Sequence, residues 1–198
     1  MQMENSALKR IQAILIFAFA LGCISTVGCS ASRHRAATSS DSYRNQQLAA
    51  ELTHSATKLM AEDPLKAEEL LREAIDADLY HGPAHNNLGV LYLNRGELYQ
   101  AAEEFDWARR LMPGHPDPRI NLGLALERGG KYGEALDAYA SALQVYPEHL
   151  PSVQVLARCQ IRSGVRDEYT DELLKVIAYR GTHEWQSWAR NQLALSGK

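Results

Sequence analysis

Histidine side chains are the first candidates for chemistry in this chain. His81 and His85 have the i, i+4 spacing that can hold a metal ion on one face of a helix. Gly82 and Pro83 lie between them, so the two imidazoles are not expected on one regular helix, and a turn histidine is the favoured interpretation. The sequence therefore predicts no metal site, and it offers no residues for a cofactor.

Carboxylate pairs do not supply an active site either. Glu68 with Glu69 and Glu103 with Glu104 are adjacent and alternate with small apolar residues, as on a solvated helix face. No nucleophile is accompanied by a nearby base or by a glycine-rich elbow. Because none of the catalytic roles is filled, we expect that the protein is not an enzyme.

Asparagine and arginine residues recur at a fixed interval and could bind a peptide. Asn87 and Asn121 are 34 residues apart, as are Arg128 and Arg162. Amide side chains pair with the donors and acceptors of an extended backbone, and guanidinium groups take a carboxylate in a bidentate fashion. A segment with an acidic or free C-terminal group would suit them. The alternative is that the arginines are solvated helix ends that complement the helix dipole, and that the asparagines touch no ligand.

The elements that carry these residues repeat at the same interval. The columns are Ala67, Ala101 and Ala135; Leu71, Phe105 and Tyr139; Ala74, Ala108 and Ala142; Leu88, Leu122 and Leu156; and Gly89, Gly123 and Ala157. Within one unit, Ala101, Phe105 and Ala108 have i, i+4 and i+7 spacing and form one stripe of a helix. The small residues, including Gly89 and Gly123, would let the facing helices approach closely.

Glycine and proline predict where the helices end and begin. Gly96, Gly130 and Gly164 occur near the ends of three first helices, where a left-handed residue can stop a helix. Pro83, Pro118 and Pro151 fall where first helices should begin. Asp63 and Asp117 each precede a proline and are predicted N-caps. No segment has the pattern of a strand.

The columns, closed by Pro113 and Pro147, resemble the tetratricopeptide repeat, in which each unit is a helix, a turn and a helix. The resemblance implies an all-α fold, a short right-handed solenoid of antiparallel helix pairs at residues 45–198. The clear repeats are 82–115 and 116–149, and 48–81 and 150–183 are degenerate units. In the last unit, Tyr169, Leu173 and Val176 replace the alanine, aromatic and alanine columns, so its second helix should pack differently. Trp185 and Trp188 suggest a final capping helix.

In the resembled family, the first helices line a concave groove that binds a segment of a partner protein. By position, the resemblance implies a peptide-binding groove formed by Asn87, Asn94, Asn121, Arg128, Arg158 and Arg162. Members that bind chaperone tails carry a lysine beside the asparagine. Asn86 and Ile120 stand in that place here, so that specificity is not expected.

The first 28 residues are predicted to be a signal or anchor segment, followed by a flexible tether at residues 29–44. Lys9 and Arg10 precede an apolar run at residues 11–21, as in a secretory signal. Residues 26–30 resemble a bacterial lipoprotein processing site, which implies that Cys29 is lipidated. Cys23 is the rival cysteine. Ordinary cleavage after Ala31 and an uncleaved anchor are the alternatives.

Composition narrows the class of partner. The 21 basic and 24 acidic residues are interspersed, and the net charge of −3 gives no electrostatic reason to expect nucleic acid. We therefore expect a protein–protein interaction adaptor, exported and tethered to a membrane, in the cell envelope at the outer membrane or in the periplasm, or anchored to the inner membrane. The alternative is a structural assembly factor for a pilus or secretion machine at the bacterial outer membrane. Cys159, outside the leader, is expected to be a small core residue.

Overall fold

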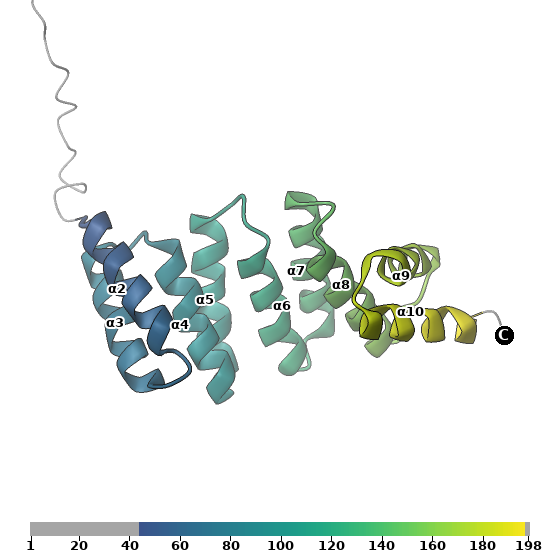
Figure 1. Cartoon of the computed structure of the whole chain (residues 1–198), viewed down its shortest axis with the longest axis horizontal. Coiled ribbons are helices and arrows are strands. Elements are labelled where there is room, and N and C mark those ends of the chain that lie inside the picture. The colour runs from purple at the N-terminus through teal and green to yellow at the C-terminus, as the bar shows by residue number, and fades with distance from the viewer. Residues whose placement is uncertain (1–43, 197–198) are drawn as a thin grey trace, which may run out of the picture. The chain divides into compact units, whose positions relative to one another are not determined.

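The computed structural model describes residues 44–196, which form nine helices and no strand. The helices are α2 (Gln46–Leu59), α3 (Pro64–Ala77), α4 (Gly82–Arg95), α5 (Leu98–Leu111), α6 (Asp117–Arg128), α7 (Tyr132–Val145), α8 (Leu150–Arg162), α9 (Glu168–Arg180) and α10 (His183–Ser196). Consecutive helices pack against each other, and α2 to α7 stand side by side, whereas α9 and α10 run in other directions (Figure 1). The predicted all-α stack of helix pairs is confirmed. Cys23, Cys29 and the predicted anchor lie outside the described residues, as does all but the end of the tether.

The turns within the pairs repeat one geometry. Gly96, Gly130 and Gly164 have φ angles of 79°, 76° and 76°, in the left-handed region that favours glycine. At the first of them, the Gly96 N–H donates to the carbonyl of Leu93, and the next N–H, of Glu97, donates to Tyr92. The same two bonds recur at the other two glycines. The three predicted turns are therefore confirmed.

The predicted helix starts are only partly correct. Asp63 is an N-cap, because its side chain accepts a hydrogen bond of 3.0 Å from the Lys66 N–H. The prediction for Asp117 is wrong. Pro116 is already helical, with φ −74° and ψ −30°, and its carbonyl accepts the N–H groups of Arg119 and Ile120. Helix α6 therefore begins one residue earlier than predicted, with Pro116 as its N-cap. Asp117 lies in its first turn and does not cap it.

Glycine in the first helices makes room for an aromatic ring in the second. A Cβ atom on Gly89 would lie 2.7 Å from the ring of Phe105, and one on Gly123 would lie 2.4 Å from the ring of Tyr139. Both rings are completely buried. The close approach expected from these columns is confirmed. A glycine destabilises a helix by about 1 kcal/mol, and burial of the ring that it makes room for offsets this cost.

The second helix of the last unit buries a different face. Residues 34 positions beyond the α7 stripe are Tyr169, Leu173 and Val176, but the buried residues of α9 are Thr170, Leu173, Leu174 and Ile177. This shift by one residue is a rotation of about 100°. Tyr169 is too large for the fully buried place of Ala135, so the helix turns it outward. Figure 1 shows α9 almost end-on, whereas α5 and α7 are seen from the side.

Helix α10 closes the stack by packing on α9. Ala189 is completely buried, and the half-buried Trp185 and Trp188 meet edge to face with ring centroids 5.3 Å apart. The predicted capping helix is confirmed. None of the helices between residues 44 and 196 is long and apolar enough to cross a membrane.

The start of the described chain is fixed to the end of the first helix pair. The Arg44 guanidinium donates to both carboxylate oxygens of Asp78, at 2.8 and 3.2 Å. The backbone N–H of Asn45 donates to the carbonyl of Ala77 at 2.8 Å. The hydrogen bond from Arg44 holds the pKa of the buried Asp78 below its usual range. Residue 44 is therefore clamped to the end of α3.

Candidate peptide-binding groove

Polar side chains from three first helices form a hydrogen-bonded chain. The Asn87 amide on α4 donates to Oγ1 of Thr57 on α2 at 3.0 Å. Asn121 on α6 donates to Oδ1 of Asn86 at 3.0 Å, and Asn86 donates to Asn87 at 3.5 Å. The predicted groove residues Asn87 and Asn121 are thus linked through Asn86, which belongs to no repeated asparagine column. The chain spans α2, α4 and α6, which contact one another in order.

The amides in this chain keep capacity for a ligand. An asparagine side chain has two N–H donors and one carbonyl that can accept two hydrogen bonds. Asn121 uses one donor toward Asn86, so its carbonyl can accept from a backbone N–H. Asn87 uses one donor toward Thr57. Their neighbours hold these amides in place, and the amides can still form hydrogen bonds with an extended backbone.

Two of the predicted arginines meet at a buried carboxylate. Glu127 on α6 is 4% exposed, and its Oε1 accepts a hydrogen bond of 2.9 Å from Arg162 on α8. Its Oε2 accepts from the Tyr139 hydroxyl at 2.8 Å and lies 3.7 Å from a guanidinium nitrogen of Arg158. A buried carboxylate is costly unless it is paired in this way. The prediction of the groove missed Glu127. This residue occupies a repeat position at which the neighbouring units have Leu93 and Ile161, so a carboxylate among apolar residues could have drawn attention to it.

The charge of this cluster is unbalanced. One carboxylate faces the two guanidinium groups of Arg158 and Arg162, and the Arg162 side chain is 56% exposed. The excess positive charge lies on the α8 side, where it could attract an anionic group. Burial, followed by the hydrogen bond to Glu127, raises the pKa of Tyr139, so its hydroxyl remains a donor.

Arg128 and Asn94 lie near the ends of their helices. The Arg128 guanidinium donates at 3.1 Å to the carbonyl of Leu93, in the last turn of α4. This contact ties the ends of α4 and α6 together and agrees with the alternative interpretation of Arg128 as a helix-end residue. Asn94 is exposed beside Leu93. Contact of either side chain with a ligand stays a prediction.

A small pocket lies where α10 faces Arg158. Arg158, Glu184, Trp185 and Trp188 line this space of about 300 Å³. The Nε atom of Arg158 is buried and has no hydrogen-bond partner within residues 44–196. A guanidinium donor, an acidic acceptor and two indole rings together could hold an apolar residue and its backbone groups. The sequence prediction included Arg158 but assigned the tryptophans only to the cap.

His81 and His85 do not form a metal site together. His81 is the N-cap of α4, whereas His85 is buried inside it. Nδ1 of His85 lies 2.7 Å from Oε2 of Glu104, and Nε2 lies 3.0 Å from the carbonyl of Leu79. Both partners are acceptors, so only a protonated ring satisfies both contacts. Among residues 44–196, no three histidine, cysteine or acidic side chains gather as metal ligands.

The sequence of this chain is similar to those of known repeat proteins. A model of the tetratricopeptide repeat family matches residues 58–116 and again residues 87–149. Tetratricopeptide repeat protein 28 of Mus musculus is 28% identical over 98 residues, which is 50% of this chain and 4% of that protein. The chain therefore spans a small fraction of this curated relative. These matches confirm that the chain contains tetratricopeptide repeats.

Solved structures agree in fold. The first tetratricopeptide domain of Spaghetti (RPAP3), bound to the HSP90 peptide SRMEEVD, has a TM-score of 0.58 and 19% identity, and the match covers 62% of this chain and 98% of that one. An O-GlcNAc transferase of Thermobaculum terrenum has a TM-score of 0.59 and 22% identity. That match covers 65% of this chain but 25% of the transferase chain. At these identities the likeness shows the fold alone.

Proposed function

We propose that this protein is an exported, membrane-tethered adaptor that holds an extended segment of a partner protein against its first helices. The observation that carries this proposal is the hydrogen-bonded chain from Thr57 through Asn87 and Asn86 to Asn121, which crosses three consecutive first helices. Repeat solenoids use such surfaces for binding. The RPAP3 domain, which has the same fold, is bound to a peptide.

The ligand is expected to be extended rather than helical. Packed helices lie roughly 10 Å apart, and an extended chain advances about 3.3 Å per residue, so about three ligand residues correspond to each repeat. Amides at the repeat interval would then meet the ligand backbone at regular steps. The excess guanidinium charge around Glu127 favours a ligand with an acidic side chain or a free carboxylate near α8.

Membrane tethering would strengthen a modest contact. It rests on the sequence of the first thirty residues, which are not among the described ones, and on the proposed lipidation of Cys29. Confining the adaptor and its partner to one membrane raises their effective concentration without any new contact. The protein would then act in the cell envelope, at the outer membrane or in the periplasm.

The groove is tested by affinity capture of partners from an envelope extract. The test variant combines Asn121→Ala, Arg128→Ala and Arg162→Ala, with Glu127→Gln added because Arg162 is a partner of this buried carboxylate. A matched control combines Lys66→Ala, Arg110→Ala and Lys175→Ala, on exposed faces of second helices. We expect the groove variant to lose the captured partner and the control to keep it.

Both variants are compared with the wild type by thermal unfolding. If the groove variant keeps its partner at unchanged stability, the groove proposal is wrong. The assembly-factor alternative, which uses the outer and end surfaces of the stack, would then be favoured.

The anchor is tested separately by labelling cells with a radioactive fatty acid. We expect the wild type and Cys23→Ala to take up label and Cys29→Ala to lose it. Label that persists on Cys29→Ala would exclude this lipidation site while leaving the groove proposal intact.

A further inference from the structure

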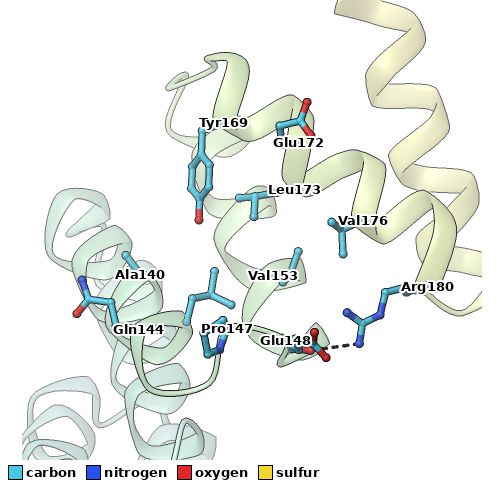
Figure 2. A pocket seen from close by; sticks show the side chains of 11 residues that line it. Ala140, Gln144, Pro147, Glu148, Val153, Tyr169, Glu172, Leu173, Val176 and Arg180 are labelled. Atoms are coloured by element: carbon cyan, nitrogen blue, oxygen red, sulfur yellow. Dashed lines mark hydrogen bonds between the residues drawn. The ribbon is translucent and has the colours of Figure 1, made fainter.

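A second and larger pocket lies on another side of the stack, between α7, α8 and α9. Its volume is about 490 Å³. Figure 2 shows the ring of Tyr169 standing on one side and Ala140 of α7 facing it across the opening. Val153 of α8 and Val176 of α9 add to the apolar part of the lining, which also contains Gln144, Glu148, Glu172 and Arg180. None of the six predicted groove residues contributes to it.

Four lining positions on α7 and α8 differ in character from those one repeat earlier. The positions 34 residues before Ala140, Leu143, Gln144 and Val153 are Asp106, Arg109, Arg110 and Arg119. Asp106 there forms ion pairs with both Arg109 and Arg110. At three of these four positions, two on α7 and one in the first turn of α8, a charged residue has thus been replaced by an apolar one. The rotation of α9 adds Tyr169 to the same opening.

Helix α9 also carries the side chain that could fill such an opening. Tyr179 is 86% exposed and lies between Val176 and Arg180, which both line the pocket. The charges of α9 are divided along its length. Glu168, Asp171 and Glu172 lie in its first half, and Lys175 and Arg180 lie in its second half. An antiparallel pair of such helices would bring each acidic half against a basic half.

We propose that this face binds a second copy of the chain, with the two α9 helices antiparallel about a two-fold axis near Val176. Leu173 and Tyr179 are each three residues from that axis, and Glu172 and Arg180 are each four. Tyr179 of one copy therefore lies over Leu173 of the other, and Glu172 faces Arg180 of the other. A two-fold interface requires this reciprocity, in which one patch supplies both the projecting side chain and the pocket.

The contact is expected to be weak and reversible. Helix α9 has 13 residues, so it is roughly 20 Å long. The two tyrosines would bury about 150–250 Å² each. The flanking side chains bring the interface to the lower end of the range for specific contacts, about 1,200 Å² in total.

Sedimentation velocity of the full chain in mild detergent, over a series of protein concentrations, measures the self-association. We expect a concentration-dependent dimer that Tyr179→Ser weakens about tenfold or more, as for an aromatic anchor of an interface. Tyr99→Ser is the matched control, because Tyr99 is 81% exposed on α5 and does not line the pocket. A chain that stays monomeric throughout, or equal effects of the two variants, would overturn the proposal.

A charge exchange tests the register. Arg180→Glu alone should weaken the dimer, because Glu172 of the other copy would then face a second acidic group. Adding Glu172→Arg to it should restore the dimer, since each pair is then merely reversed. Circular dichroism verifies that each variant is folded. If the double variant associates no better than Arg180→Glu, the antiparallel pairing is wrong.

Discussion

The hydroxyl of Tyr139 donates a hydrogen bond of 2.8 Å to the carboxylate of Glu127 and so joins the aromatic column of the second helices to the polar cluster of the first. Tyr139 also packs its ring on Gly123. The other carboxylate oxygen of Glu127 accepts from Arg162. One buried carboxylate therefore connects α6, α7 and α8.

Tyr139→Phe should destabilise the fold although the ring remains. We expect the free energy of unfolding to fall by about 1.5–3 kcal/mol, the range for a hydrogen bond to a charged group. Urea denaturation followed by circular dichroism measures it. Tyr132→Phe is the control, because Tyr132 is half-buried on the same helix and no hydrogen bond to its hydroxyl occurs within residues 44–196. The control should change stability by less than about 0.5 kcal/mol. Equal losses would contradict this role for Glu127.

Gly123→Ala should be destabilising because its Cβ would lie 2.4 Å from the Tyr139 ring. We expect a loss of about 1–3 kcal/mol, as for other overpacked sites. Adding Tyr139→Leu should relieve the clash, because leucine lacks the ring atoms that the added Cβ would meet. A double-mutant cycle measures this coupling. Gly133→Ala on α7 is the control, because nothing lies within 4 Å of its added Cβ. A cycle without coupling would show that the ring is not the obstacle.

His85 should contribute more stability at low pH than at high pH. Burial alone would lower its pKa, but the hydrogen bonds to Glu104 and to the Leu79 carbonyl outweigh burial and raise the pKa above its ordinary value of 6.5. The folded state thus holds this proton more tightly than the unfolded state. The contribution is fully present below pH 6.5 and is lost as the pH rises through the raised pKa.

The difference in unfolding free energy between the wild type and Glu104→Gln, measured over a pH series, isolates this contribution. The difference should shrink as the pH rises. His81 has the opposite dependence because burial lowers its pKa, but it is present in both proteins. A difference that grows with pH would contradict the assignment.

Cys159 should resist thiol reagents in the folded protein. It is completely buried, and burial raises its pKa to about 11, so little thiolate forms at neutral pH. Alkylation of the Cys159 peptide, followed by mass spectrometry, should become fast only where urea unfolds the stack. Rapid labelling without denaturant would show that α8 opens locally.

The repeat interval was sufficient to predict the stack and its turns because both depend on local rules. The left-handed glycines end the first helices of three units, and the glycines of the two clear units make room for the ring that faces them. The rotation of α9 is different, since it arises from competition between Tyr169 and the small place of Ala135. Comparison with the other repeats shows that Tyr169 is an unusual residue at its position. It does not show which face of α9 is buried as a result.

The candidate site was less predictable for a related reason. The columns identified Asn87, Asn121, Arg128 and Arg162 by repetition, and most of their contacts in the structure are to residues outside their own columns. Asn86 and Glu127 have no counterparts of the same type one repeat away. Because they act as links between repeats, their importance appears only when the neighbouring helices are placed side by side.

The contact between Arg44 and Asp78 has a mechanical consequence. A pull transmitted along the backbone into residue 44 is borne first by the two hydrogen bonds to the Asp78 carboxylate and by the bond from Asn45 to Ala77. The load thus passes to the end of α3 before it can unwind α2 from its first turn. A protein pulled at residue 44 would therefore keep its first helix pair together until these three hydrogen bonds break.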